Sequence, residues 1–375
     1  MMLDDQTMGE DLPRDKALEL ERARDLVSRH GWNATAYQIL NPGIERWFSG
    51  GGDAVVGFVV HAGYRVVAGS PICAPERLDA VVEEFEADTH RRGLWSCYFA
   101  ADDRLARRLD RRGPLDRILL GAQPVWDPAA WPGILARKAS LRAQLNRARN
   151  KGVDVELWAA ERATDHPELQ RCLDEWLSTR GLPPLHFLVE PETLGRLYDR
   201  RVFVAQLAGR PVGFLVASPV PARDGWLIEQ NIRGHGAPNG TTELLIDAAW
   251  RHLAEVGAEY VTLGLCPLSR RADVRAPRQH WWLRFLLAWV RAHGRRFYNF
   301  DGLDAYKTKF VPERWEPIYA ITSERRLGLG TLWAIAGAFG KMSPPLLVTR
   351  ALVRAVRQEI LWLRQKSRGR PDSSL

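Results

Sequence analysis

Short apolar runs alternate with amphipathic stretches along the first third of the chain. The runs typical of buried strands are "AVVGFVV", "YRVVAGSPIC", "LWSCYFA" and "DRILLGAQPVW". Apolar residues at helical spacing predict helices over Lys16–His30, Pro75–Arg92 and Asp102–Arg111. This interleaving predicts a mixed α/β unit that ends near Trp131.

The same kind of alternation begins again after Gly152. The strand "VDVELWA" and a helix over His166–Arg180 precede a hairpin, "RVFVAQLAGRPVGFLVASPV", which turns at Ala208-Gly209. The strand "GWLIEQNIR", the glycine-rich "GHGAPNG", a helix from about Thr241 to Val256 and the strand "EYVTLGL" follow. This order resembles one half of a GNAT-type acyltransferase, and the first unit has a looser version of the same order.

We therefore predict an α/β fold with two GNAT-like (acyl-CoA N-acyltransferase-like) subdomains in tandem. The predicted parts are an N-terminal subdomain over 14–131, a basic connecting helix over 132–152, a C-terminal catalytic subdomain over 153–325, and a basic amphipathic helical tail over 326–375. In the tail, "LGLGTLWAIAGAFG" is too short to span a membrane and predicts a core or interfacial helix. The rest of the tail either docks on the protein or lies on an anionic membrane surface.

Charge adds a preference for phosphate-bearing partners. The formal net charge is +8 and the sequence pI is about 9.5, which favours nucleic acid, anionic lipid or a nucleotide. The four cysteines form no CxxC pair, and the first residues are acidic and polar, unlike a secretory signal. A reducing cytoplasm without a disulfide framework is the expected setting.

The glycine-rich segment between strand and helix is a candidate anion site. Arg233, Gly236, Asn239 and Gly240 lie before a helix whose free N–H groups favour anions. The spacing differs from the dinucleotide fingerprint, and no phosphate-binding GxxxxGK[ST] motif occurs. A pyrophosphate loop for acyl-CoA and a plain tight turn both remain open. Glu243, in the first helical turn, is either a dipole-stabilising carboxylate or a general base or ammonium ligand.

Two further features have both a functional and a structural interpretation. The predicted helix from Ile134 to Lys151 carries only basic charge, so it is either a phosphate-contacting face or a solvated one. Cys266 follows a strand, but no helper histidine is evident, which favours an inert buried thiol. The candidate phosphate or tRNA contacts on the basic helix are Arg137, Lys138, Arg142 and Arg147.

Several motifs together resemble the C-terminal catalytic domain of the bacterial phosphatidylglycerol lysyltransferases and alanyltransferases, the multiple peptide resistance factor family. They span roughly Val55 to Ala320 in the family's order, and the last is the most specific. The motifs are "GSPICAPERLDAVVEEF", "LRAQLNRARNKGV", "RPVGFLVASP", "APNGTTELLIDAAW", "VTLGLCPLS" and "FYNFDGLDAYKTKFVPERWEPIYA".

The resemblance implies transfer of an aminoacyl group from aminoacyl-tRNA to the hydroxyl of phosphatidylglycerol, in a tunnel between the two subdomains. It implies a base or ammonium-binding role for Glu243, and a phosphate or oxyanion role for Arg233. Lys307 and Lys309, with Tyr306, match the family's "YK.KF" element and imply a phosphate contact. Further substrate contacts are expected from Gly236, Asn239, Gly240, Asp301, Trp315 and Tyr319. No metal or nucleotide cofactor is required.

The chain departs from the family's pattern at two places. Gly69-Ser70-Pro71 stands where the family has glycine-aspartate-proline, and Ile318 stands where an arginine is usual. The family's multi-span flippase region is missing from this sequence, so the resemblance implies a cytoplasmic protein bound peripherally to the inner face of the plasma membrane. Helical spacing puts Tyr306 and Lys309 on one face and Lys307 on another, so at most one lysine is expected beside the tyrosine.

Two other functions remain as alternatives. One keeps the fold but takes acyl-CoA as donor, with "RGHGAPNG" as the pyrophosphate loop. The other is a non-catalytic adaptor that binds anionic membrane or tRNA through its basic surface.

Overall fold

The computed structural model describes residues 14–111, 116–179, 186–272, 300–324 and 327–340. Its N-terminal half consists of alternating strands and helices. Strand-forming, Val-rich segments lie where the sequence predicts them, because each has one face or both faces buried. The elements are α1 Arg14–His30, β1 Glu45–Phe48, β2 Val55–His61, β3 Tyr64–Ala68, α2 Leu78–Arg91, β4 Trp95–Ala101, α3 Asp103–Asp110 and β5 Arg117–Trp126.

The C-terminal half repeats this organisation after two short helices. Its elements are α4 Trp131–Arg137, α5 Ala139–Arg149, β6 Val153–Trp158, α6 Ala160–Ala163, α7 Pro167–Ser178, β7 Arg201–Leu207, β8 Arg210–Val220, β9 Gly225–Arg233, α8 Thr241–Glu255, β10 Tyr260–Thr262, β11 Cys266–Pro267, α10 Phe300–Thr308, β12 Arg314–Thr322 and α11 Leu329–Phe339. Short 3₁₀ turns include Tyr37–Leu40 and Pro221–Arg223. The predicted hairpin turn is present between β7 and β8, where Ala208 and Gly209 both have positive φ.

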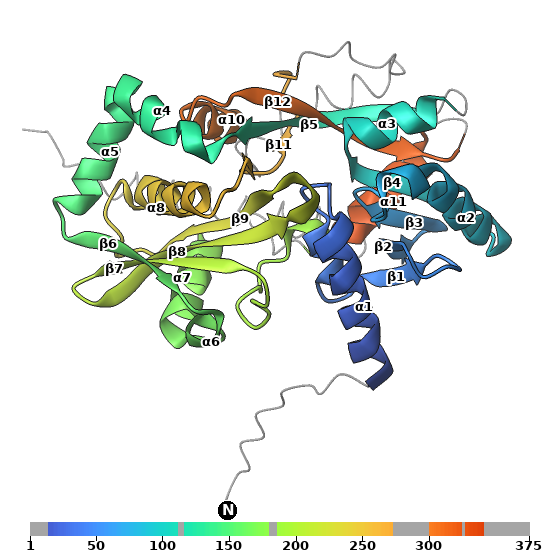
Figure 1. The fold of residues 1–375 in the computed structure, drawn as a ribbon, viewed down its shortest axis with the longest axis horizontal. Coiled ribbons are helices and arrows are strands. Elements are labelled where there is room, and N and C mark those ends of the chain that lie inside the picture. Colours follow the sequence, from blue (N-terminus) through green and yellow to red (C-terminus); the bar gives the residue numbers. More distant parts are fainter. Residues whose placement is uncertain (1–13, 112–115, 180–185, 273–299, 325–326, 341–375) are drawn as a thin grey trace, which may run out of the picture.

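One continuous sheet of twelve strands joins the two halves, which lie side by side in Figure 1. Its order is β1-β2-β3-β4-β12-β5-β10-β9-β8-β7-β6, and β11 also pairs with β5. Two neighbouring pairs, β3–β4 and β9–β10, are parallel, and the other pairs are antiparallel. Each half therefore contributes one parallel pair with a helix between its strands, α2 in the first half and α8 in the second.

The strand β12 crosses from the C-terminal end of the described chain into the N-terminal half. It lies between β4 and β5, with Tyr319 opposite Ala101 on one side and Leu119 on the other. The prediction of an α/β fold with tandem GNAT-like halves is confirmed. The predicted subdomain boundaries remain a proposal, since β12 shares its hydrogen bonds with β4 and β5.

The predicted single basic helix is wrong, because the structure has two helices that meet at Lys138. Lys138 has φ −112° and ψ 85°, which interrupts the helical backbone. Arg142 donates from Nη1 to the carbonyls of Leu135 and Ala136, at 2.5 and 2.7 Å, and so satisfies the last turn of α4. Arg142, which belongs to the basic pattern, therefore also stabilises the break between α4 and α5.

The segment "LGLGTLWAIAGAFG" forms helix α11, which packs on β2 and β3. Gly337 lets the helix approach closely, since a Cβ there would lie 2.2 Å from a ring atom of His61. Leu329 and Trp333, at helical spacing i and i+4, are 72% and 44% exposed. One face of α11 therefore belongs to the core and another faces outward. The remainder of the predicted tail, 341–375, lies outside the described residues.

The last family motif, "FYNFDGLDAYKTKFVPERWEPIYA", contains one helix and most of one strand in the described structure. Phe300 begins helix α10, and residues 297–299 lie outside the described residues. Within "GLDAYKTKF", residues 302–308 form the rest of α10, and "EPIYA" lies in β12.

Candidate active site

A carboxylate and an ammonium group meet where the start of α8 faces the end of α10. Glu243 is only 8% exposed, and its Oε1 forms an ion pair with Nζ of Lys309. Its Oε2 accepts a hydrogen bond of 2.8 Å from the hydroxyl of Thr242. The two charged residues are 66 positions apart in the chain, so the fold brings together two candidate site residues that were predicted from separate motifs.

Aromatic rings complete the surroundings of Lys309. Its Nζ lies 4.0 Å from the ring centroid of Tyr306 and 5.0 Å from that of Phe310. A cation over aromatic faces is stabilised by the ring quadrupole. The prediction that Tyr306 and Lys309 share a helical face is confirmed.

Asn231, on β9, is a site residue that the sequence analysis missed. Its Nδ2 donates to the backbone oxygen of Thr242 at 3.1 Å and to the hydroxyl of Tyr306 at 3.3 Å. Its Oδ1 is shielded from solvent and has no hydrogen-bond partner within the described residues. An acceptor oxygen is therefore left for a donor group of a ligand. A polar residue two positions before the end of β9, just ahead of the glycine-rich segment, was the available signal.

Electrostatics keep the carboxylate ionised at neutral pH. Burial raises the pKa of Glu243, but the hydrogen bond and charge of Lys309, with the Thr242 hydroxyl, act more strongly together and lower its pKa below the ordinary value. Burial raises the pKa of Tyr306, and the nearby Glu243 carboxylate raises it further, so the phenol stays protonated. Tyr306 is thus a hydrogen-bond donor or acceptor here and not a base.

Lys307 points away from this pair. Its Nζ donates to the backbone oxygens of Gly264 and Leu265, at 2.8 and 3.0 Å, between β10 and β11. Burial lowers the pKa of Lys307 to about 8, while Cys266 and Asp304 act in the opposite direction. Lys309 therefore lies beside the carboxylate, whereas Lys307 anchors the backbone that follows β10.

One glycine of the glycine-rich segment allows the chain to pack closely against α5. Gly240 has φ +97°, and a Cβ there would lie 2.1 Å from the backbone oxygen of Gln144 on α5. At Gly236, by contrast, no described atom lies within 4 Å of the position that a Cβ would take. Arg233 is exposed and donates to Oδ1 of Asn239 at 3.0 Å. The backbone at Gly240 therefore packs directly against α5.

The remaining candidates lie in separate surroundings. Arg137, Lys138 and Arg147 are exposed, as a phosphate-contacting surface requires. Trp315 is half-buried on β12, and the guanidinium of Arg271 lies 5.5 Å from its ring centroid.

Tyr319 and Ile318 lie in the core of the N-terminal half. Tyr319 is 3% exposed and belongs to a core cluster with Tyr98 and Leu109, whereas Tyr306 packs against the core of the C-terminal half. Ile318, the residue in place of the family's arginine, is buried in a third cluster. The side chain of Asp301 lies outside the described residues.

Cys266 is buried on β11, and burial raises the pKa of its thiol to about 11. A thiol of that pKa is protonated at neutral pH, which agrees with the inert interpretation. Within the described ranges, no group of three histidine, cysteine or acidic side chains is placed to hold a metal ion.

Comparison with known proteins gives a consistent result. The family model for the C-terminal part of phosphatidylglycerol lysyltransferase matches residues 23–322. The chain is 25% identical over 331 residues to phosphatidylglycerol lysyltransferase of Bacillus subtilis (strain 168), covering 86% of this chain and 37% of that protein. It therefore spans well under half of the length of this relative.

Solved structures of similar fold include two bacterial proteins. The C-terminal domain of a putative lysylphosphatidylglycerol synthetase from Agrobacterium fabrum superposes with a TM-score of 0.72 at 25% identity, covering 87% of this chain and 98% of that one. L-PGS from Bacillus licheniformis gives 0.68 at 20% identity, covering 90% and 95%, and supports the fold alone. With four-fifths of its sequence matched by the family model, this chain belongs to the family of phosphatidylglycerol lysyltransferase C-terminal domains.

Proposed function

We propose that the protein transfers an aminoacyl group, of the lysyl or alanyl type, from aminoacyl-tRNA to the hydroxyl of phosphatidylglycerol or a related membrane lipid. The observation that carries the proposal is the buried Glu243–Lys309 pair beside Tyr306 and Asn231, in a chain of this family. The pair supplies a base and a cation in one place, which acyl transfer to a hydroxyl uses.

The donor ester is already activated, so the protein has only to position the acceptor and manage one proton. The lipid hydroxyl oxygen attacks the ester carbonyl, the bond to the terminal ribose oxygen of the tRNA breaks, and a new ester forms on the lipid. Glu243, as an ionised carboxylate, accepts the hydroxyl proton and returns it to the ribose oxygen. The ammonium of Lys309 faces the negative charge that develops on the carbonyl oxygen.

Asn231 gives the site an orienting acceptor. Its buried Oδ1 has no partner within the described residues, and an α-ammonium group of the aminoacyl donor would supply the missing donor. The carboxylate of Glu243 could hold the same ammonium group, since Glu243 and Asn231 both contact Thr242.

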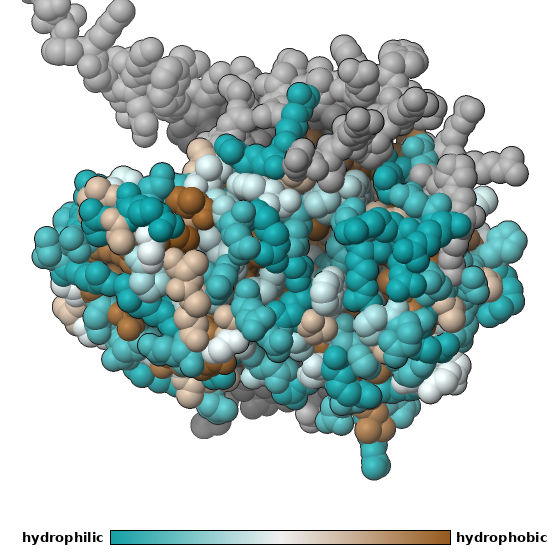
Figure 2. Space-filling view, turned by 45° about the horizontal axis from the view of Figure 1, so that its top comes forward, coloured by the Kyte–Doolittle hydropathy of each residue, from teal (hydrophilic) through white to brown (hydrophobic). Residues whose placement is uncertain are grey.

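The surfaces suit a tRNA donor and a lipid acceptor. Arg137, Lys138 and Arg147 are exposed on the basic helices, and they would contact tRNA phosphates. The face of the molecule in Figure 2 is mainly hydrophilic, with hydrophobic residues in small separate patches. None of the helices in the described ranges has the length and hydropathy of a membrane span. We propose peripheral association with the inner face of the plasma membrane, to which Leu329 and Trp333 on α11 contribute exposed apolar side chains.

The experiment is transfer of radiolabel. Purified protein is incubated with tRNA charged with labelled lysine or alanine and with vesicles that contain phosphatidylglycerol, and the lipid fraction is counted. We expect the wild type and the exposed control Glu255→Gln to label the lipid, and Glu243→Gln to leave it unlabelled. If no charged tRNA ever labels the lipid, the proposal is wrong.

An acyl-CoA donor is the alternative that keeps the fold, with "RGHGAPNG" as the pyrophosphate loop. Calorimetry with CoA thioesters separates the two donors, since the tRNA proposal predicts no tight CoA site. The adaptor alternative predicts instead that Glu243→Gln leaves the cellular function of the protein intact.

A further inference from the structure

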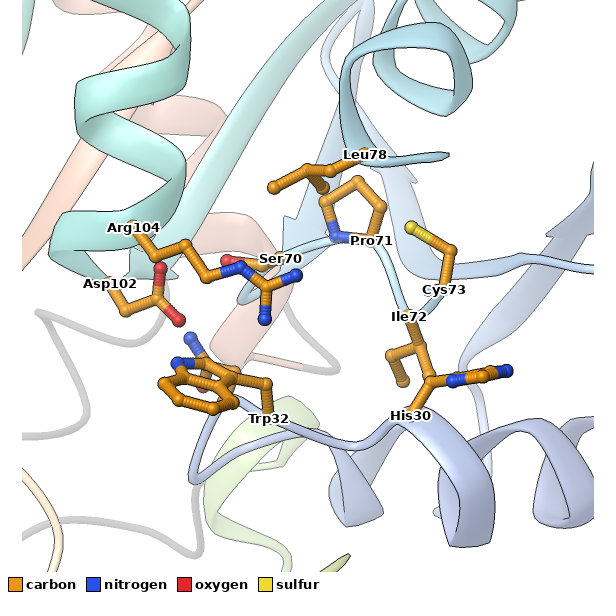
Figure 3. A pocket seen from close by; sticks show the side chains of 10 residues that line it. His30, Trp32, Ser70, Pro71, Ile72, Cys73, Leu78, Asp102 and Arg104 are labelled. Atoms are coloured by element: carbon orange, nitrogen blue, oxygen red, sulfur yellow. The ribbon is translucent and has the colours of Figure 1, made fainter. Parts of the chain in front are cut away.

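A pocket lined by both polar and apolar side chains lies in the N-terminal half, at the carboxyl ends of β3 and β4 (Figure 3). Ser70 follows β3 and Asp102 follows β4, so both belong to the ends of a parallel strand pair. Ligands of α/β sheets commonly bind beyond the carboxyl ends of such strands. β12 and β5 separate this pair from β9–β10, so the pocket is distinct from the Glu243 site.

Arg104 is the cation of this pocket. Figure 3 shows its guanidinium extending between Trp32 and the Ser70-Pro71 stretch, and its centre lies 5.1 Å from the Trp32 ring centroid. It forms no ion pair with any residue that the structure describes, whereas Arg107 and Arg108 on the same helix pair with Asp103 and Asp79. A half-buried guanidinium that no carboxylate of the described residues contacts directly can bind an oxyanion.

Ser70 adds a hydroxyl that has no partner of its own. Its Oγ is shielded from solvent and makes no hydrogen bond within the described part of the chain. The preceding Gly69 has φ +79°, and a Cβ there would lie 2.5 Å from the hydroxyl oxygen of Thr35, so the loop is held tightly against the segment after α1. The hydroxyl is therefore fixed at the pocket wall, with its hydrogen-bonding capacity unused.

Asp102 places an acceptor beside the cation. One of its oxygens caps α3 by accepting the N–H of Leu105 at 2.9 Å. Figure 3 shows the carboxyl group turned toward Trp32, within the same pocket as the Arg104 guanidinium. A ligand that carries only negative charge would be repelled here, whereas a phosphate ester with a neighbouring hydroxyl fits both groups.

We propose that this pocket binds a glycerol phosphate group, with Arg104 and Ser70 on the phosphate and Asp102 accepting a hydroxyl of the glycerol. The group has two possible sources, free glycerol phosphate and the headgroup of a phospholipid. The lipid source rests on the proposed function, but binding to the pocket does not. The lysines of the family motif are engaged elsewhere, Lys307 by carbonyls and Lys309 by Glu243, which leaves Arg104 as the pocket cation for a phosphate.

Calorimetry on the full chain tests the site with three probes: inorganic phosphate, glycerol phosphate and glycerophosphoglycerol, the deacylated headgroup. We expect glycerol phosphate to bind more tightly than inorganic phosphate, and Arg104→Met to weaken it by at least about tenfold. Asp102→Asn should weaken glycerol phosphate relative to inorganic phosphate, because it removes the hydroxyl acceptor, while the loss of the carboxylate charge relieves the repulsion of inorganic phosphate. Arg107→Met, on the exposed side of α3, is the matched control and should bind like the wild type. Tighter binding of glycerophosphoglycerol than of glycerol phosphate would assign the site to a lipid headgroup, and the reverse order to the free ester.

Folding and function are controlled separately. Arg104→Lys keeps the charge and should retain part of the affinity, while thermal melting reports whether each variant is folded. Equal affinity of the wild type and a folded Arg104→Met, no binding of any probe, or displacement of glycerol phosphate by a short RNA at lower concentration would overturn the proposal. Label transfer to lipid without probe binding would refute this pocket and keep the proposed function, and probe binding without label transfer would do the opposite.

Discussion

Lys307 offers the sharpest test of how the site is built, because its ammonium is buried and contacts only backbone carbonyls among its hydrogen-bond partners in the described structure. The change is Lys307→Met, which keeps the apolar stem and removes the titrating group. If Lys307 anchors the segment after β10, its removal should alter the pH dependence of stability. If it instead acts on substrate from a solvent-like environment, the pH dependence should stay the same.

The magnitude follows from the pKa of Lys307. Burial lowers it from 10.5 to about 8, so between these values the folded state is neutral while the unfolded state still binds a proton. The free energy of unfolding therefore rises with pH across this window, since the unfolded state holds more protons. The full difference corresponds to about 3 kcal/mol, of which about 2 kcal/mol falls between pH 7 and pH 9.5.

Urea unfolding at pH 7, 8, 9 and 9.5 measures this effect as a difference between wild type and variant. Other groups titrate in the same range, but they are shared by both proteins, so the difference isolates Lys307. We expect the wild type to gain about 2 kcal/mol over Lys307→Met across the series. The exposed Lys151→Met is the control and should follow the wild type. Parallel curves for wild type and Lys307→Met would refute the anchoring role.

Three further changes test the site and the surface. Glu243→Gln should lower kcat for lipid labelling by about 100-fold or more without unfolding the protein, since it removes the proposed base. Because Lys309 lowers the pKa of Glu243, the ion pair should stabilise the protein at neutral pH and be lost only as the pH falls through that lowered pKa. Gly240→Ala should destabilise by at least about 2 kcal/mol in urea unfolding, through its positive φ and the clash with α5. Leu329→Ser with Trp333→Ser should weaken sedimentation with anionic vesicles by about tenfold.

Each of these changes has a matched control on the same chain. For the base, Glu255→Gln on the same helix should keep full activity, and equal losses in the two variants would contradict the proposed role of Glu243. For the glycine, Gly236→Ala has room for a Cβ and should be nearly neutral; a similar loss at both positions would refute the packing argument. For the surface, Leu18→Ser removes a 57% exposed leucine on α1, and equal effects on vesicle binding would show that α11 is not a specific contact.

The local patterns of the sequence determined most of the elements. Periodicity located most of the strands, though not β1, and also the β7–β8 hairpin and the helix that starts at Thr241, because burial of one face leaves a repeating trace in neighbouring residues. Helical spacing also predicted that Lys309, directly after α10, lies beside Tyr306. The break between α4 and α5 left no such trace, since the basic residues around Lys138 suit one helix or two.

Only the tertiary structure decided which distant residues meet. Glu243 and Lys309 were both candidates, but their ion pair depends on the fold bringing the start of α8 to the residue after α10, across 66 residues of chain. Asn231 carried almost no signal, because an amide on a strand looks the same whether it faces solvent or a site. The position of β12 between β4 and β5 likewise depends on long-range pairing, which strand periodicity does not specify. The sequence by itself determined the elements and the candidate chemistry, and tertiary packing decided that Lys309 joins the carboxylate while Lys307 holds the backbone.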